Sequence, residues 1–425
     1  MGKTMRSTRR ALTAVVSAAA LLVASACGSG DDDESRATTV EVFTWWAEGG
    51  EKAGLDALVA RFAADCAGQT FENGVVAGGA GINAKQVLDA RLRQNDPPDT
   101  FQVHAGAELL DRIDAGQVAD LTAAFDSWGL REALPDGLVE GLTVNGKIYS
   151  VPAGVHRANV VWTNDQVLSD AGILLPPKSL AEFVGNLKRL RAAGVESPLA
   201  LGRDWTQLML LEAVLLSELG PQRFTGLFTG TTPWTGTVVT KAIKDYGTIL
   251  EYSNADRDSL DWPQAQRLLI DGKAGYQLMG DWAAAELTAN SFAGYDTFVF
   301  PGNGTAFQWL ADSFTLTTGA ANPDGATCWL RTVASAPGQQ AFNARKGSIP
   351  ARTDAPTEGF TDYQIATAAD WKSGLPVPSC AHGSACSQPW QNAANAALGA
   401  FSTSGDAGVL QSALAAAAKQ FIRRQ

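Results

Sequence analysis

The sequence TVEVFTWWAEGGEKAGLDALVARF, at residues 39–62, contains a strand followed by a helix. Residues 39–43 are rich in Val, Thr and Phe, which is typical of a β-strand. Apolar residues then recur at positions i, i+3, i+4 and i+7 between Leu55 and Phe62, which places them on one face of a helix. A strand followed by a helix is the repeating unit of α/β folds.

This alternation continues along the chain. Further strands are predicted at residues 100–103, 146–151, 159–162, 298–300 and 314–317. Helices are predicted around residue 88 and at residues 180–193, 206–219, 237–252, 262–272, 281–290, 325–336 and 408–423. Strands that alternate with helices predict an α/β fold with parallel sheets. Because 425 residues are too many for one hydrophobic core, we expect two domains.

The first 26 residues are predicted to be a signal peptide. Four basic residues, at positions 3, 6, 9 and 10, precede an apolar stretch at residues 11–23 that is too short to span a bilayer as a helix. Ala24, Ser25 and Ala26 then precede Cys27 as in a lipobox, where the cysteine is lipidated. Plain signal cleavage is the alternative, since Ala24 stands where leucine is usual. Residues 27–37 are acidic and polar, which predicts a flexible tether.

The net charge argues against some classes of partner. Residues 1–26 contain four basic residues and no acidic ones, so the net charge of −11 becomes −15 without them (−11 − 4). Such a surface disfavours nucleic acid. Neither nucleotide-binding nor metalloprotease signatures occur in the sequence, and we predict no cofactor and no metal site. A secreted glycoside hydrolase remains an alternative, because sequence spacing does not reveal its paired carboxylates.

Five cysteines are present. If Cys27 carries lipid, four remain, and an even number in an exported protein indicates two disulfides. Cys380 and Cys386 would close a short loop and are expected to pair. That pairing leaves Cys66 and Cys328 for each other.

Two tryptophans, Trp45 and Trp46, stand at the carboxyl end of the first strand, where open α/β sheets bind ligands. Indole rings stack on the apolar C–H faces of sugars. Neighbouring residues of a strand point to opposite faces, so at least one of the pair also fits a core position. Gln102 and His104 end another strand two residues apart and therefore share a face. Both side chains donate and accept hydrogen bonds, as sugar hydroxyls require, although a histidine buried in the core is the alternative.

Other polar residues have weaker signals. Asp281 precedes a predicted helix and suits either an N-cap or a sugar hydroxyl. Asp312 precedes a predicted strand, where a cap or turn is the alternative. A lysine before Gly-Ser, such as Lys346, is usually a solvated loop charge. His382 lies inside the expected Cys380–Cys386 loop, and a disulfide there would fix its position.

Several segments occur in one order between about residues 40 and 383. They are 42–47 (VFTWWA), 78–84 (GGAGINA), 96–106 (DPPDTFQVHAG), 150–152 (SVP), 156–160 (HRANV), 199–202 (LALG), 205–207 (WTQ), 279–283 (MGDWA), 312–314 (DSF) and 346–352 (KGSIPAR). Together they resemble the substrate-binding proteins of ABC transporters, and within that group the glucose/galactose-binding proteins.

The resemblance implies an α/β periplasmic-binding-protein fold of the maltose-binding type. Such a fold has two lobes, each a sheet flanked by helices, joined by a hinge of crossing strands that lets them close on the ligand. We expect the first lobe at residues 38–154 and 312–355, and the second at 155–311 and 356–425. This division places Cys66 and Cys328 in one lobe, which supports their pairing.

The resemblance also implies a set of sugar contacts. The first lobe would supply Trp45, Trp46, Gln102 and His104, and the second lobe Asp281 and the stacking platform Trp262. Asp312, Lys346 and His382 would complete the polar set. Glu51 matches more loosely, because residues 48–50 do not align cleanly. Residues 376–386 depart from the family pattern in their two cysteines and their prolines.

Together these features predict a monomeric extracytoplasmic lipoprotein, anchored to the outer face of the membrane through Cys27. It would bind a monosaccharide such as glucose, galactose or mannose without catalysis. The permease subunits of an ABC importer would receive the sugar. A binding protein for an oligosaccharide or another polyol is the alternative.

Overall fold

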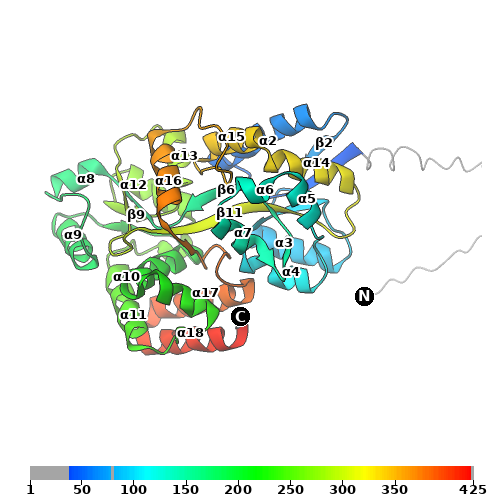
Figure 1. The fold of residues 1–425 in the computed structure, drawn as a ribbon. Coiled ribbons are helices and arrows are strands. Elements are labelled where there is room, and N and C mark those ends of the chain that lie inside the picture. Colours follow the sequence, from blue (N-terminus) through cyan, green and yellow to red (C-terminus); the bar gives the residue numbers. More distant parts are fainter. Residues whose placement is uncertain (1–37, 78–80, 423–425) are drawn as a thin grey trace, which may run out of the picture.

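Two mixed β-sheets, each flanked by helices, lie side by side in the computed structural model, which describes residues 38–77 and 81–422 (Figure 1). The predicted signal peptide, the tether and the lipidation of Cys27 lie outside the described residues, as do residues 78–80 of the glycine-rich segment. Within the described ranges, no helix combines the length and apolar character needed to cross a membrane.

The first sheet has the strand order β12-β11-β3-β1-β2, and β6 also pairs with β11. Its strands are β1 (Thr39–Phe43), β2 (Thr70–Asn73), β3 (Thr100–His104), β6 (Val151–Arg157), β11 (Ala306–Leu316) and β12 (Leu375–Pro378). The elements around it are α2 (Gly49–Asp65), α3 (Ile82–Arg93), η2 (Ala107–Leu109), α4 (Leu110–Asp114), α5 (Thr122–Ser127), α6 (Leu130–Ala133), α7 (Asp136–Leu142), β4 (Thr143–Val144), β5 (Lys147–Ile148), α14 (Pro323–Ala334) and α15 (Ala336–Lys346).

The second sheet has the order β10-β7-β9-β8. Its strands are β7 (Val160–Thr163), β8 (Leu199–Ala200), β9 (Tyr276–Leu278) and β10 (Thr297–Val299). The remaining helices are α8 (Asp165–Asp170), α9 (Leu180–Ala192), α10 (Trp205–Thr229), α11 (Thr237–Leu250), η3 (Arg257–Ser259), α12 (Trp262–Ile270), α13 (Ala283–Ala289), α16 (Asp362–Ser373), α17 (Gln388–Ser404) and α18 (Ala407–Phe421).

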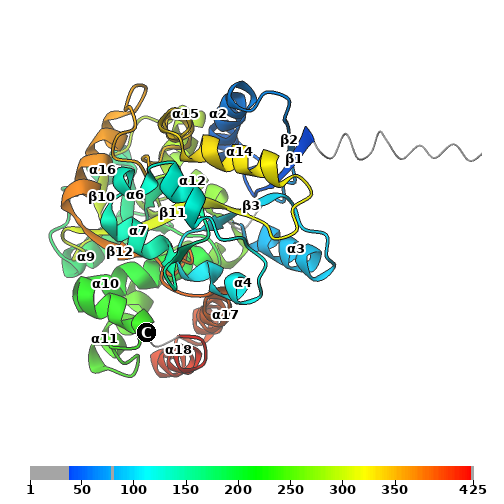
Figure 2. The same cartoon turned by 45° about the vertical axis from the view of Figure 1, so that its right-hand side comes forward.

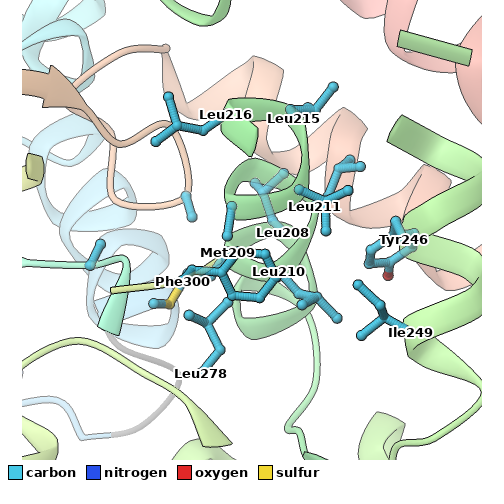
Figure 3. Packing of buried hydrophobic residues seen from close by; sticks show 14 of the residues in the cluster. Leu208, Met209, Leu210, Leu211, Leu215, Leu216, Tyr246, Ile249, Leu278 and Phe300 are labelled. Atoms are coloured by element: carbon cyan, nitrogen blue, oxygen red, sulfur yellow. The ribbon is translucent and has the colours of Figure 1, made fainter. Parts of the chain in front are cut away.

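The buried apolar residues form two separate cores, which define the two lobes. The first lobe packs around residues such as Phe101 and Trp329. The second lobe packs around α10, whose leucines lie beside α11, Leu278 of β9 and Phe300, the residue after β10 (Figure 3). Strands β6 and β11 run from one lobe to the other (Figures 1 and 2). The predicted two-lobed α/β fold is therefore confirmed, while the lobe boundaries given above stay a prediction.

The prediction of parallel sheets is wrong. Although β1 pairs in parallel with β2 and β3, β11 runs antiparallel to both β3 and β6, and the second sheet is also mixed. The predicted strand at residues 314–317 is only the end of β11, and the strand predicted at 146–151 is replaced by β5 and β6. Both long strands are almost wholly buried, including their polar residues, so they lack the alternating pattern that reveals a half-exposed strand.

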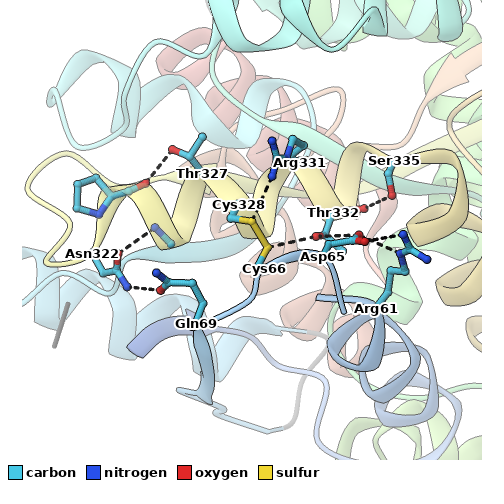
Figure 4. The surroundings of a disulfide bond; sticks show 12 residues. Arg61, Asp65, Cys66, Gln69, Asn322, Thr327, Cys328, Arg331, Thr332 and Ser335 are labelled. Atoms are coloured by element: carbon cyan, nitrogen blue, oxygen red, sulfur yellow. Dashed lines mark hydrogen bonds and ion pairs between the residues drawn. A yellow bond between two sulfur atoms is a disulfide. The ribbon is translucent and has the colours of Figure 1, made fainter. Parts of the chain in front are cut away.

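Both expected disulfides are present, between Cys66 and Cys328 and between Cys380 and Cys386. The first joins the residue after α2 to α14 (Figure 4). Nearby, the Asp65 carboxylate accepts hydrogen bonds from Arg61 and, at 3.4 Å, from the Thr332 hydroxyl. The bond spans 262 residues of sequence and therefore closes a long loop in the unfolded chain.

Removing this disulfide with the paired substitution Cys66→Ala and Cys328→Ala should lower the free energy of unfolding by about 2–4 kcal/mol, because the unfolded chain regains conformational entropy. Denaturant titration of the variant and the parent measures the difference. Thr327→Val, at an exposed position on the same helix, serves as the control and should change stability little. Equal stability of the double variant and the parent would show that the bond contributes nothing.

Candidate functional site

A cavity of about 370 Å³ lies between the two lobes. Trp45 and Glu51 line it from the first lobe, and Trp262 and Trp282 line it from the second. A larger groove of about 540 Å³ lies on the second lobe beside α11 and α17 and contains none of the predicted site residues. The cavity between the lobes is thus the one that the sequence predictions point to.

The wall of this cavity depends on a close approach of the two lobes. The N-terminus of α2 packs against α13, and a Cβ atom built on Gly50 would lie 2.3 Å from Cβ of Ala285. Gly49 beside it has a φ of +56°, a conformation that favours glycine. These two glycines, to which the sequence analysis assigned no role, allow α2 and α13 to pack closely.

A chain of buried histidines and carboxylates lies behind the cavity. On the crossing strand β6, His156 contacts Asp281 through Nδ1, and its Nε2 lies 3.0 Å from Oδ2 of Asp312. Asp312 in turn accepts a bond of 3.3 Å from Nε2 of Gln102, and its Oδ1 lies 3.8 Å from Nε2 of His104. Gln102 and His104 therefore share a face, as their spacing predicts.

The side chain of Asp281 does not cap a helix, and Asp312 does not have the alternative role of cap or turn residue. Asp312 lies within β11 and is 3% exposed, so it is neither a cap nor a turn residue. The side chain of Asp281, which is fully buried, accepts bonds from His156 and from the backbone N–H of Arg157 at 2.9 Å. Its two carboxylate oxygens thus accept hydrogen bonds from β6 rather than from the first turn of α13.

Burial opposes charge on these groups, but their neighbours outweigh it. Burial works against the imidazolium of His156, yet Asp281 and Asp312 raise its pKa above the ordinary 6.5. Burial likewise works against the Asp312 carboxylate, yet His156, Lys346 and His104 hold its pKa well below the ordinary value. The centre of the site is therefore a compensated set of buried charges.

Glu108 extends this set on the side of the first lobe. Its Oε2 lies 2.7 Å from Nζ of Lys85 and 3.1 Å from Nδ1 of His104. Burial opposes ionisation, but Lys85 and His104 lower the pKa of Glu108 to about 2. His104 is held between Glu108 and Asp312, and its ring lies against the indole of Trp45 at 5.2 Å between centroids.

The two adjacent tryptophans have different roles in the structure. Trp45 lines the cavity, whereas Trp46 is fully buried and packs against Phe314 and Phe342. Lys346 is not a solvated charge. It is 2% exposed, with Nζ 5.6 Å from the Trp46 ring centroid and 3.1 Å from Oε1 of Glu51. Trp46 thus packs beneath Lys346, and the carboxylate that pairs with Lys346, Glu51, lines the cavity.

His382 lies in the disulfide loop and packs against Trp282. Their ring centroids are 5.2 Å apart, and His382 also lies edge-on to Trp205 and His104. Its Nδ1 is 2.9 Å from the Ser379 hydroxyl, and its Nε2 has no hydrogen-bond partner among the described residues. Burial lowers the pKa of His382 well below 6.5, and the nearby His104 and Lys85 lower it further. This ring is therefore neutral near pH 7.

The structure brings the ten predicted site residues together at the lobe interface. Trp45, Glu51 and Trp262 line the cavity, and the other seven are buried around it. Sequence reasoning missed His156, Trp282, Trp205 and Glu108. For His156 the available signal is that the chain has only three histidines, all of which lie in this cluster. Trp282 directly follows Asp281, so its nearness to the site was also open to inference from the sequence.

Residues 46–340 match the family described as bacterial extracellular solute-binding protein. The chain belongs to this family. A solute-binding protein holds its ligand without converting it, so the chain is not an enzyme, and the glycoside hydrolase alternative is set aside.

Several relatives are similar over most of the chain. An ABC transporter extracellular-binding protein of Pyrococcus horikoshii is 32% identical over 375 residues, covering 86% of this chain and 84% of the relative. A probable sugar-binding periplasmic protein of Mesorhizobium japonicum is 32% identical and covers 76% and 78%. The glucose-binding protein of Saccharolobus solfataricus is 28% identical and covers 57% and 46%. Among solved structures, a chitin oligosaccharide binding protein has a TM-score of 0.79 at 20% identity, covering 90% and 98%, which shows the shared fold.

Proposed function

We propose that this solute-binding protein binds a monosaccharide, such as glucose, galactose or mannose, between its two lobes and delivers it to the permease of an ABC importer. The observation that carries the proposal is the meeting of three tryptophans, Trp45, Trp262 and Trp282, in one cavity beside buried hydrogen-bonding groups. Indole faces stack on the C–H faces of a pyranose, and the polar groups satisfy its hydroxyls.

The size of the cavity supports a small sugar. Ligand pockets typically measure about 300–1,000 Å³, and the volume of about 370 Å³ is near the lower limit. Close packing of α2 against α13 bounds the cavity on the side lined by Gly49 and Gly50. These features favour a monosaccharide over an oligosaccharide.

Each proposed contact has a role that follows from its position. Trp262 and Trp45 are the stacking surfaces, one from each lobe. Trp46 supports Lys346 from beneath, while Lys346 and Glu51 form the polar edge at 3.1 Å from each other. Further hydrogen bonds to hydroxyls would come from the buried polar set Gln102, His104, Asp281, Asp312 and His382.

The relatives support the proposed ligand and partner. The probable sugar-binding protein and the glucose-binding protein, at 32% and 28% identity, carry sugar names, and the Pyrococcus relative is named for an ABC transporter. Lipidation of Cys27 would hold the protein at the outer face of the membrane, close to such a transporter. We further propose that the protein acts as a monomer.

Titration of the purified protein with glucose, galactose, mannose, maltose and sorbitol tests this function. At a concentration of 100 times Kd, the bound sugar should stabilise the protein by about 2.7 kcal/mol and raise its Tm. Gluconate is the control. It resembles glucose in size but carries a negative charge that the acidic cavity lining, with Glu48, Glu51 and Glu286, should disfavour. A response to maltose alone would favour the oligosaccharide alternative, and no response to any sugar would contradict the proposal.

A further inference from the structure

The loop at residues 379–386 follows β12 and is tied to the second lobe by one buried carboxylate. Glu212, in the middle of α10, is 1% exposed. It accepts hydrogen bonds from the Ser379 hydroxyl at 2.9 Å and from the backbone N–H groups of Cys380 at 2.5 Å and Ala381 at 3.2 Å. Because the surrounding residues of α10 are buried in the core of the second lobe (Figure 3), Glu212 is a fixed anchor for the loop.

The same loop also contacts the first lobe. Its carbonyl groups at Ser384 and Gly383 accept hydrogen bonds from the backbone N–H groups of Ala107 and Glu108, at 3.2 and 2.9 Å. The disulfide between Cys380 and Cys386 closes the loop between these attachments. The loop is therefore held from both lobes and leaves its one histidine, His382, little freedom to move.

The hydrogen bonds at Ser379 determine which nitrogen of His382 carries the proton. A serine hydroxyl has one hydrogen, and Ser379 donates it to Glu212. The same oxygen lies 2.9 Å from Nδ1 of His382 and can therefore only accept from it. The neutral ring then carries its hydrogen on Nδ1, which leaves Nε2, without a partner among the described residues, as an acceptor.

We propose that Glu212 is a positioning residue that acts through Ser379 to fix His382 in its Nδ1–H form, so that Nε2 accepts a hydrogen bond from a hydroxyl of the ligand. This inference rests on the sugar site proposed above. It adds a requirement for specificity, namely that the ligand must present a donor at the position next to Trp282. A ligand with an ether oxygen or a hydrogen atom there would leave Nε2 unsatisfied.

Burial raises the pKa of Glu212 to about 7, against the effect of its three hydrogen-bond donors. Measurements at about pH 8.5 therefore keep the carboxylate ionised. A long-range proton–nitrogen spectrum distinguishes protonated from unprotonated ring nitrogens. The protein has only three histidines, so His382 is assigned by comparison with His382→Ala.

In the parent protein we expect Nδ1 of His382 to be protonated. In Glu212→Gln the amide can donate to Ser379, which frees the serine hydrogen for Nδ1, so the protonated nitrogen should change to Nε2. Sugar affinity should fall about tenfold, the usual effect of one lost hydrogen bond to a neutral group. The same substitution should cause no further loss in the His382→Ala background, because Glu212 acts through that ring.

Glu218→Gln is the matched control. It lies on the same helix, and its carboxylate pairs with Lys241 at 2.7 Å. It should change neither the protonated nitrogen nor the affinity. An Nε2–H ring in the parent, or an Nδ1–H ring that persists in Glu212→Gln, would overturn the inference. Unchanged affinity in His382→Ala would likewise overturn the contact between Nε2 and the ligand. Failure of the proposed function is a separate result, because it is seen as no response to any sugar and the spectra do not depend on sugar binding.

Discussion

Replacing His156 by leucine is expected to lower the free energy of unfolding by about 3–5 kcal/mol near neutral pH. The ring lies between two buried carboxylates, with Nδ1 on Asp281 and Nε2 on Asp312. Leucine removes both hydrogen bonds and the positive charge, and it leaves two carboxylates that are 0% and 3% exposed without that partner. Uncompensated buried charge is among the most destabilising single changes in a protein. Denaturant unfolding of the variant and the parent measures the loss.

His382→Leu is the matched control for this prediction. Both histidines are buried, but the pKa of His382 is lowered and its one hydrogen bond is to Ser379. Removing His382 therefore leaves no buried charge without a partner. It should cost clearly less than the loss of His156. An equal loss of unfolding free energy in the two variants would contradict the prediction that His156 stabilises the fold by compensating buried charge rather than by packing.

The effect of His156 should also depend on pH. Its pKa is raised by folding, so its contribution to stability is fully present below its ordinary value of 6.5 and is lost as the pH rises through the raised value. Asp312 remains ionised over this range, because its folded pKa is lowered. The difference in stability between parent and variant should therefore shrink toward alkaline pH.

Helices and strands with one solvent-exposed face could be predicted from the sequence, whereas fully buried elements could not. The strand at residues 39–43 has the bounds of β1, and the helices at residues 180–193 and 237–252 agree with α9 and α11 within two residues. These elements have one buried and one exposed face, so their periodicity is visible. Strand β11 is buried along ten of its eleven residues and crosses between the lobes, so only its end was predicted.

Some residues of the candidate site could be predicted from local sequence, whereas others depend on contacts between distant segments. Strand ends with aromatic and polar residues, such as Trp45 and His104, follow from pattern and chemistry. The pairing of Asp312 with His156 does not, because 156 residues separate them in sequence and only the antiparallel pairing of β6 with β11 brings them together. Local sequence favours a solvated charge at Lys346, and only the resemblance placed it in the site. Its burial depends on Glu51 and Trp46, which are distant in sequence.

The largest effect on sugar binding is expected from Trp262→Ala. Trp262 is the first residue of α12, and its backbone N–H donates a hydrogen bond of 2.8 Å to the Asp261 carboxylate. This bond fixes the backbone that carries the indole. The ring is 9% exposed and lines the cavity opposite Trp45. Truncating a buried aromatic anchor of this kind typically costs about 2–4 kcal/mol of binding free energy, or about 30- to 1,000-fold in Kd.

Calorimetric titration of the sugar that binds in the panel above measures this loss. Trp262→Phe should recover part of the affinity, because a smaller aromatic face still stacks on the sugar. Trp128→Ala, which removes a partly buried tryptophan from the end of α5 in the first lobe, should leave Kd unchanged. If Trp262→Ala bound the sugar as tightly as the parent while both proteins remained folded, the sugar would have to bind away from this wall. The tryptophan-lined cavity between the lobes would then lose its proposed role.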